Sequence, residues 1–143
     1  MNEEYPGAAV ISDLFPLRCN LTGAENIAFV RQFHGHEKRA KSLAAAREVL
    51  EWSGHGAAVN KRDGDMSEQE RLATKVARAQ MLGRPVLVVD RPGAMLPNAD
   101  YPPWIFSLLT QYAGRFERLD VLDYEWNRPL YREILACEPS NSR

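Results

Sequence analysis

Hydrophobic and polar positions along the chain predict three short buried strands separated by longer helices. The apolar run Ala8–Ile11 stops at a polar pair, which is typical of a buried strand that ends in a loop. Residues 85–90 contain four consecutive apolar β-formers and end at Asp90, which predicts the central strand of a parallel sheet, buried on both faces. Residues 119–124 show a weaker pattern of the same kind and predict a third strand.

Between these strands, apolar residues recur at the spacing of helices. Thr22 is followed three residues later by Glu25, which is the pattern of a capping box at a helix start. Ser67 is expected to cap a later helix that closes at Gly83. Helices are predicted over residues 23–33, 37–52, 67–80, 104–113 and 130–136.

The order strand, helices, strand, helix, strand indicates an α/β fold with about three parallel strands and flanking helices. We expect a single domain over residues 1–143, in which residues 23–82 form a helical subdomain inserted between the first and second strands. Functional side chains in such folds lie at the carboxyl ends of the strands. Asp13 and Asp90 are therefore candidate site residues.

Composition narrows the function classes. The 143 residues are 45% hydrophobic and 26% charged, enough for one domain with a sizeable core. A net charge of −1 gives no general footprint for nucleic acid. No signal peptide or apolar span is visible, so we expect a cytoplasmic protein without direct membrane insertion. Cys19 and Cys137 suggest neither a disulfide framework nor a zinc site.

Several segments, in order and at the family's spacing, resemble the nucleotide-binding domain of ABC transporters. Residues 66–71, Met-Ser-Glu-Gln-Glu-Arg, are similar to the signature L-S-G-G-Q/E, and an alanine-rich helix follows. Residues 86–92, Val-Leu-Val-Val-Asp-Arg-Pro, are similar to the Walker B strand that ends in D-E-P. Residues 21–27, Leu-Thr-Gly-Ala-Glu-Asn-Ile, look like the segment after the Q-loop. Their sequence is most similar to that segment in exporters of capsular polysaccharide and O-antigen.

The resemblance covers about residues 8–124 and implies a truncated core of the P-loop NTPase type with a helical subdomain. It places Asp13, Ser67 and Asp90 at vestigial nucleotide-binding positions, with Asp13 where the Q-loop glutamine would be. Asp90 would bind Mg²⁺ if it acted as a Walker B aspartate. Because Mg²⁺ is usually held together with substrate phosphates, a structural residue at the end of a strand is the favoured interpretation.

The residues that carry ATP chemistry in that family are replaced in this sequence. The sequence contains no G-x-x-x-x-G-K-S/T phosphate loop. Glu68 and Gln69 stand where the signature glycines approach the γ-phosphate, and Arg91 stands where the catalytic glutamate follows Asp90. Asp123 and Tyr124 stand after the third strand, where the family has a switch histidine. We therefore expect a pseudo-ATPase with no catalytic residues and no ATP or metal cofactor, in which Arg91 forms an ion pair with Asp90.

Aromatic residues are the candidates for a protein interface, with packing in the local core as the alternative. They are Tyr101, Trp104, Phe106 and Trp126. In the family, the phosphate-loop strand pairs with the third strand recognised here. The resemblance therefore predicts that residues 119–124 form an exposed edge. The segment over residues 126–136, the N-terminal residues, a second copy of the chain or another protein could cover it, and self-association is the leading hypothesis.

The retained scaffold favours a non-catalytic protein that acts through protein–protein contacts, as a homodimer or with an ABC-type partner protein. An accessory or regulatory subunit of polysaccharide export is one such role. One alternative is a subunit that completes a nucleotide site in trans with an active ABC ATPase. Another is a module that binds a small cation or ligand at the strand ends around Asp13, Asp90 and Asp123.

Overall fold

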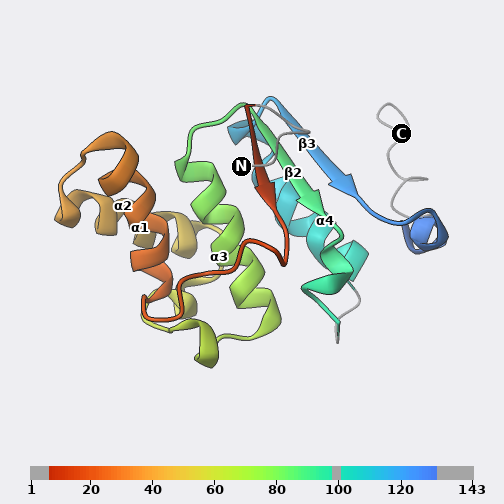
Figure 1. The fold of residues 1–143 in the computed structure, drawn as a ribbon, viewed down its shortest axis with the longest axis horizontal. Coiled ribbons are helices and arrows are strands. Elements are labelled where there is room, and N and C mark those ends of the chain that lie inside the picture. The colour runs from red at the N-terminus through yellow and green to blue at the C-terminus, as the bar shows by residue number, and fades with distance from the viewer. Residues whose placement is uncertain (1–6, 98–100, 132–143) are drawn as a thin grey trace.

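A computed structural model, which describes residues 7–97 and 101–131, shows a three-stranded parallel sheet with helices on its two sides (Figure 1). The strands lie in the order β1-β2-β3, with bounds β1 (Ala8–Ile11), β2 (Val86–Asp90) and β3 (Arg118–Leu122). Ile11 pairs with Val89, and Asp90 pairs with Leu122. The carboxyl ends of all three strands therefore meet at one end of the sheet.

β2 is the central strand, as the sequence predicts. Leu87, Val88 and Val89 have no exposed surface, whereas Val121 in β3 is 36% exposed. Within the described residues β3 pairs only with β2, so the predicted edge position of the third strand is confirmed. Among the described residues, the sheet thus has a fully buried central strand, with β1 and β3 at its two edges.

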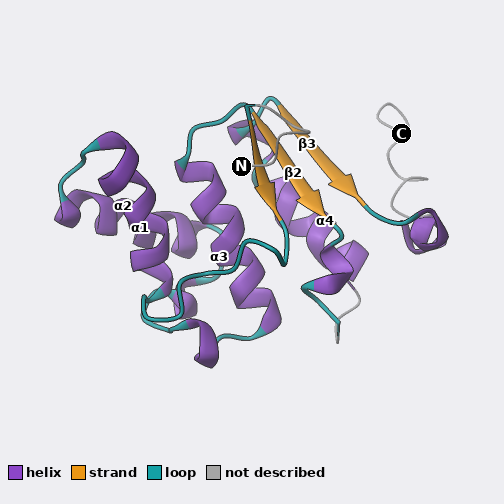
Figure 2. Cartoon of the chain, viewed as in Figure 1, coloured by secondary structure: helices purple, strands orange, loops and turns teal. Residues whose placement is uncertain are grey.

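The helices divide into two groups (Figure 2). Their bounds are α1 (Gly23–Gly35), α2 (Arg39–Trp52), α3 (Glu68–Met81) and α4 (Tyr101–Gln111). α3 lies between the α1–α2 pair and the sheet, and α4 lies behind the sheet in this view. A 3₁₀ helix, η5 (Glu125–Tyr131), follows β3. Most of the helix predicted over residues 130–136 lies outside the described residues.

Capping boxes fix the starts of α1 and α3, and both predicted N-caps are confirmed. The Thr22 hydroxyl accepts from the Glu25 amide, and the Glu25 carboxylate accepts from the Thr22 amide at 2.9 Å. Ser67 and Glu70 make the same reciprocal pair, at 3.0 and 2.9 Å. Each box satisfies two of the amide groups that a helix start leaves unpaired, so these helices begin where the sequence signals them.

The start of α1 packs tightly against the turn that precedes α3. Gly23 donates its amide hydrogen to the Lys61 carbonyl at 2.9 Å. A Cβ at Gly23 would collide with the carbonyl oxygen of Ala58, which is itself fully buried. Gly35, at the other end of the same helix, has open space around a Cβ. The glycine at position 23 is therefore required by close packing of two backbones.

Gly23→Ala is expected to lower the free energy of unfolding by about 1–3 kcal/mol, because the added methyl group must displace backbone. Gly35→Ala is the matched control in the same helix and should be neutral or stabilise the protein by up to about 1 kcal/mol. Urea unfolding followed by circular dichroism measures both values. Equal effects of the two substitutions would contradict the close packing of α1 on Ala58.

Candidate functional site

The strand ends bring together the polar residues that the sequence marks as candidates. Asp13 lies two residues beyond β1, and Asp90 is the last residue of β2. Because β1 and β2 are parallel neighbours, these two carboxylates lie at the same end of the sheet. Asp123 follows β3 at that end as well.

Arg91 occupies the position directly after Asp90 and is tied to it. Its Nε lies 3.4 Å from Asp90 Oδ1, which confirms the expected ion pair. Arg91 Nη1 donates to the Tyr124 hydroxyl at 3.1 Å, and this hydrogen bond, together with the charge of Asp90, raises the pKa of Arg91 above its ordinary value. The arrangement places a permanent cation beside the Asp90 carboxylate.

The backbone of Arg91 is left-handed, with φ of 50°. This conformation costs roughly 1–2 kcal/mol for a residue with a side chain. It persists because the Arg91 amide donates to the Leu122 carbonyl at 2.7 Å, across to β3. The position of the guanidinium is therefore fixed by the sheet as well as by its side-chain contacts.

Asp123 is engaged by its own loop. Its carboxylate accepts from the Tyr131 hydroxyl at 2.7 Å, from Asn127 Nδ2 at 2.8 Å and from the Tyr124 amide at 2.7 Å. These bonds hold η5 against the end of β3. The Asp123 carboxylate therefore anchors the segment that follows β3.

Two cations of α3, which the sequence analysis did not single out, hold the loop after β1. Lys75 is 5% exposed, and its Nζ donates to the Ser12 carbonyl at 3.3 Å. Burial is the main cause that lowers the pKa of Lys75, with a smaller contribution from Arg78. Arg78 donates to the carbonyls of Phe15 and Pro16 at 3.0 and 3.2 Å. The sequence could have identified these two residues, because a lysine and an arginine on the apolar face of a helix are unusual.

Ser67 is not part of the cluster at the strand ends. It caps α3, and Lys75, which reaches Ser12, lies eight residues further along, about 12 Å of helix. Around this helix start, Lys61 pairs with Glu70 at 2.9 Å and Arg71 pairs with Asp63 at 2.7 Å. The first turn of α3 is therefore bonded to its own neighbourhood.

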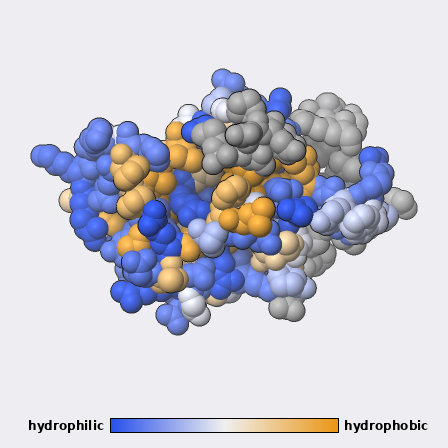
Figure 3. Space-filling model, in the orientation of Figure 1, coloured by the Kyte–Doolittle hydropathy of each residue, from blue (hydrophilic) through white to orange (hydrophobic). Residues whose placement is uncertain are grey.

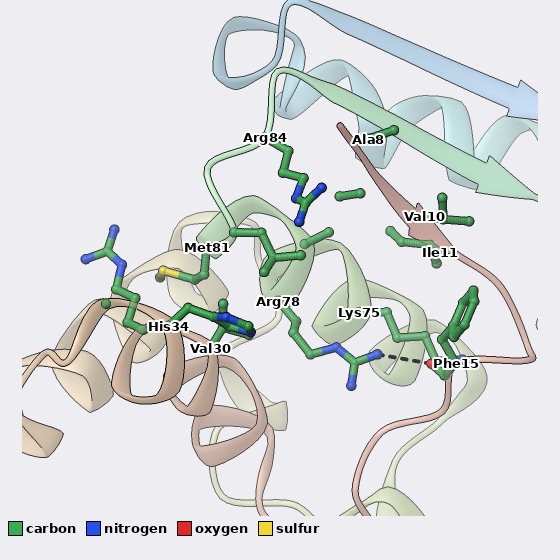
Figure 4. A pocket seen from close by; sticks show the side chains of 15 residues that line it. Ala8, Val10, Ile11, Phe15, Val30, His34, Lys75, Arg78, Met81 and Arg84 are labelled. Carbon is green, nitrogen blue, oxygen red and sulfur yellow. Dashed lines mark hydrogen bonds between the residues drawn. The ribbon is translucent and has the colours of Figure 1, made fainter. Parts of the chain in front are cut away.

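A basic groove lies between β1, α1 and α3 (Figure 4). It has a volume of about 640 Å³ and an apolar floor from β1. Its titratable lining residues are four arginine or lysine residues and one histidine, with no acidic side chain among the described residues that line it. They are Arg31, His34, Lys75, Arg78 and Arg84. In Figure 3, hydrophobic residues appear in separate patches on the visible face, one of them near its middle. The groove suits an anionic or amphipathic acidic segment better than a cation.

The aromatic interface candidates separate into packed and exposed residues. Trp104 packs against the core and stacks on His55, with ring centroids 5.9 Å apart. Phe106 is 38% exposed, and Trp126 is 72% exposed and stacks on Tyr124 at 4.2 Å. Tyr101 begins α4, and its side chain lies outside the described residues. The exposed candidates therefore lie on the side of α4 and β3.

Within residues 7–97 and 101–131, no group of three His, Cys, Asp or Glu side chains is arranged to hold a metal ion. None of the helices in that part of the chain is long and apolar enough to cross a membrane. The nucleotide-binding roles of Asp13, Ser67 and Asp90 stay predictions.

Comparison with solved structures identifies the fold. The chain is similar to "Dimeric structure of a post-hydrolysis state of the ATP-binding cassette MJ0796 bound to ADP and Pi", with a TM-score of 0.64 and 19% identity over 84% of this chain. It is also similar to "Dimeric Structure of MJ0796, a Bacterial ABC Transporter Cassette", with a TM-score of 0.62 and 18% identity over 85% of this chain. The α/β fold is therefore that of an ABC transporter cassette.

The likeness is limited in extent. This chain spans 53% and 54% of the two cassette chains, about half of their length. No family model matches the sequence, and no curated protein matches it. At 18–19% identity, the comparison with the two cassettes establishes the fold alone.

His55 connects the helical part of the chain to α4 through its stacking on Trp104. Its Nε2 is buried and has no hydrogen-bond partner among the described residues. Burial lowers the pKa of His55 below its ordinary value of 6.5. Protonation is therefore disfavoured in the folded state relative to the unfolded chain.

The free energy of unfolding is expected to fall as the pH is lowered from about 7 to about 5, because the unfolded chain takes up a proton that folded His55 resists. His55→Gln should flatten this slope, whereas His34→Gln, at an exposed position, serves as the matched control. Denaturant titrations at a series of pH values measure the slope. An unchanged slope in the His55 variant would show that this imidazole is not the group responsible.

Proposed function

We propose that this chain is a non-catalytic protein with an ABC cassette fold that acts through protein–protein contacts. The observation that carries the proposal is the pairing of Arg91 with Asp90 at 3.4 Å. In phosphoryl transfer, a carboxylate at this place holds Mg²⁺ and a neighbouring group orients the attacking nucleophile. A guanidinium stays protonated, so it cannot accept a proton from water, and it opposes a second cation at the same carboxylate.

The first turn of α3 supports the same proposal. Glu68 and Gln69 place side chains where the resemblance calls for glycines. A carboxylate at a helix start is stabilised by the helix dipole, but it repels a phosphate that would bind there. The amides of Ser67 and Glu70 are also bonded within the capping box. These contacts favour a structural capping role for the first turn of α3 over a role in binding phosphate.

The alternatives are less consistent with these contacts. A subunit that completes a nucleotide site in trans would contribute the first turn of α3, where Glu68 and Gln69 stand. A cation site at the strand ends would need Asp90 and Asp123, which are engaged by Arg91 and by the η5 loop. The basic lining of the groove beside β1 also disfavours a cationic ligand.

We further propose that the partner is a second copy or an ABC-type protein. The similar MJ0796 cassettes are described as dimeric, which makes pairing a reasonable expectation for this fold. The sequence of residues 21–27, which resembles that of polysaccharide exporters, motivates the narrower proposal that the partner belongs to such an exporter. The basic groove would suit an acidic segment of such a partner.

Calorimetric titration of the 143-residue chain with Mg·ATP tests the non-catalytic proposal. We expect no binding in the micromolar range. Arg91 forms an ion pair with Asp90, and the amides in the first turn of α3 are hydrogen-bonded within the capping box. Arg91→Ala removes the cation from Asp90 and leaves α3 intact, and we expect no binding in this variant either. A micromolar dissociation constant for the unaltered chain would contradict the proposal.

A further inference from the structure

The open edge of β3 presents the backbone N–H and C=O groups of two residues to a partner strand. The Arg118 amide donates to the Pro85 carbonyl at 3.2 Å, and the Leu122 carbonyl accepts from the Arg91 amide at 2.7 Å. In a parallel pair, alternate residues of a strand bond to the same neighbour. Residues 118, 120 and 122 therefore face β2. The N–H and C=O groups of Leu119 and Val121 point to the other side, where no strand of the described residues pairs.

An apolar groove runs beside this edge, and we call it the edge groove. It has a volume of about 660 Å³ and lies between α4, β3 and η5. Phe106 and Val121, two of its lining residues, are 38% and 36% exposed. Open strand edges next to exposed apolar surface invite pairing with another chain, and natural proteins usually cover them.

The charges on β3 are complementary to a second copy of the same strand. Arg118 and Asp120 lie two residues apart on one face of the strand, and their side chains bond to each other at 2.8 Å. In a two-fold antiparallel pair, residue i faces residue j and residue j faces residue i. Opposed residues must share a face of the sheet, so the axis can pass through Leu119, Asp120 or Val121.

Only one of these three registers uses the charges favourably. An axis at Asp120 would oppose two like carboxylates, and an axis at Val121 would place Asp120 opposite Leu122. An axis at Leu119 places Arg118 of each copy opposite Asp120 of the other. Opposite charges directly across two strands stabilise a pair, and like charges destabilise it.

We propose that two copies of this chain join β3 to β3, antiparallel and centred on Leu119, so that the two sheets become one continuous sheet. Arg118 of each copy pairs with Asp120 of the other. The outward N–H and C=O groups of Leu119 bond to those of Leu119 in the second copy. The Val121 amide donates to the Glu117 carbonyl of the second copy, whose own amide is bonded to the Pro85 carbonyl. The edge grooves meet beside the axis, and Phe106 is covered there. This inference rests on the proposed function as a contact protein and names the partner and the contact.

Light scattering on charge-swap variants tests the register. The unaltered chain should have a mass of twice 16.2 kDa at high micromolar concentration. Arg118→Asp and Asp120→Arg each place like charges across the axis, so each variant alone should be monomeric at that concentration. An equal mixture of the two variants should restore a dimer, because each copy then meets its opposite charge.

The mixture isolates the contact between copies. The bond between Arg118 and Asp120 within one chain is lost in both variants, and mixing does not restore it. The double variant Arg118→Asp/Asp120→Arg should dimerise on its own. Val121→Pro gives a second measurement: it removes an outward N–H, leaves the bonds to β2 in place, and should give a folded monomer.

Three results would overturn the inference. A monomeric unaltered chain would mean that the charges of Arg118 and Asp120 protect the edge, as charged residues do on other edge strands. A dimer that survives both single substitutions would place the contact on another surface. Two folded single variants that stay monomeric when mixed would reject the register. None of these results bears on the Mg·ATP titration, which tests the proposed function separately.

Discussion

The rest of the structure depends on the burial of β2 between β1 and β3. Leu87, Val88 and Val89 are fully enclosed, so the strand needs a sheet neighbour on each side and helices on both faces. Both neighbours run parallel to β2, which places Asp13, Asp90 and Asp123 at one end of the sheet. It also leaves β3 with one side open among the described residues.

Local charge then determines what the strand ends can do. Arg91 is held by Asp90, by Tyr124 and by a backbone bond to Leu122. Lys75 and Arg78 of α3 are committed to carbonyl groups of the loop after β1. Most cations near the strand ends thus satisfy groups of the protein itself. The chain has a fold similar to that of ABC transporter cassettes, and these cations at its strand ends bond to groups of the chain itself.

The elements with local signals could be predicted from the sequence. β1 and β2 have clear apolar runs, and Thr22 and Ser67 mark helix starts that the structure confirms. The bounds of β3 differ because the strand ends at Leu122, where Asp123 turns to accept bonds from η5. α4 begins at Tyr101, three residues before the predicted start, because prolines fit the first turn of a helix.

Contacts between distant segments could not be predicted in the same way. Lys75 reaches Ser12 over 63 positions, and His55 stacks on Trp104, which removes that tryptophan from the exposed candidates. Such pairs depend on how α3 and α4 pack on the sheet, which periodicity does not encode. The alternation of peptide groups along β3 likewise required the pairing register with β2.

Amide hydrogen exchange on the 143-residue chain, with and without Mg·ATP and at low and high protein concentration, tests the central claim most directly. The account predicts that Mg·ATP leaves exchange in the first turn of α3 and at Arg91 unchanged. Raising the protein concentration should slow exchange at Leu119 and Val121, whereas Asp120, already bonded to β2, should change little. Protection of the α3 first turn by Mg·ATP, with no concentration dependence in β3, would contradict the account.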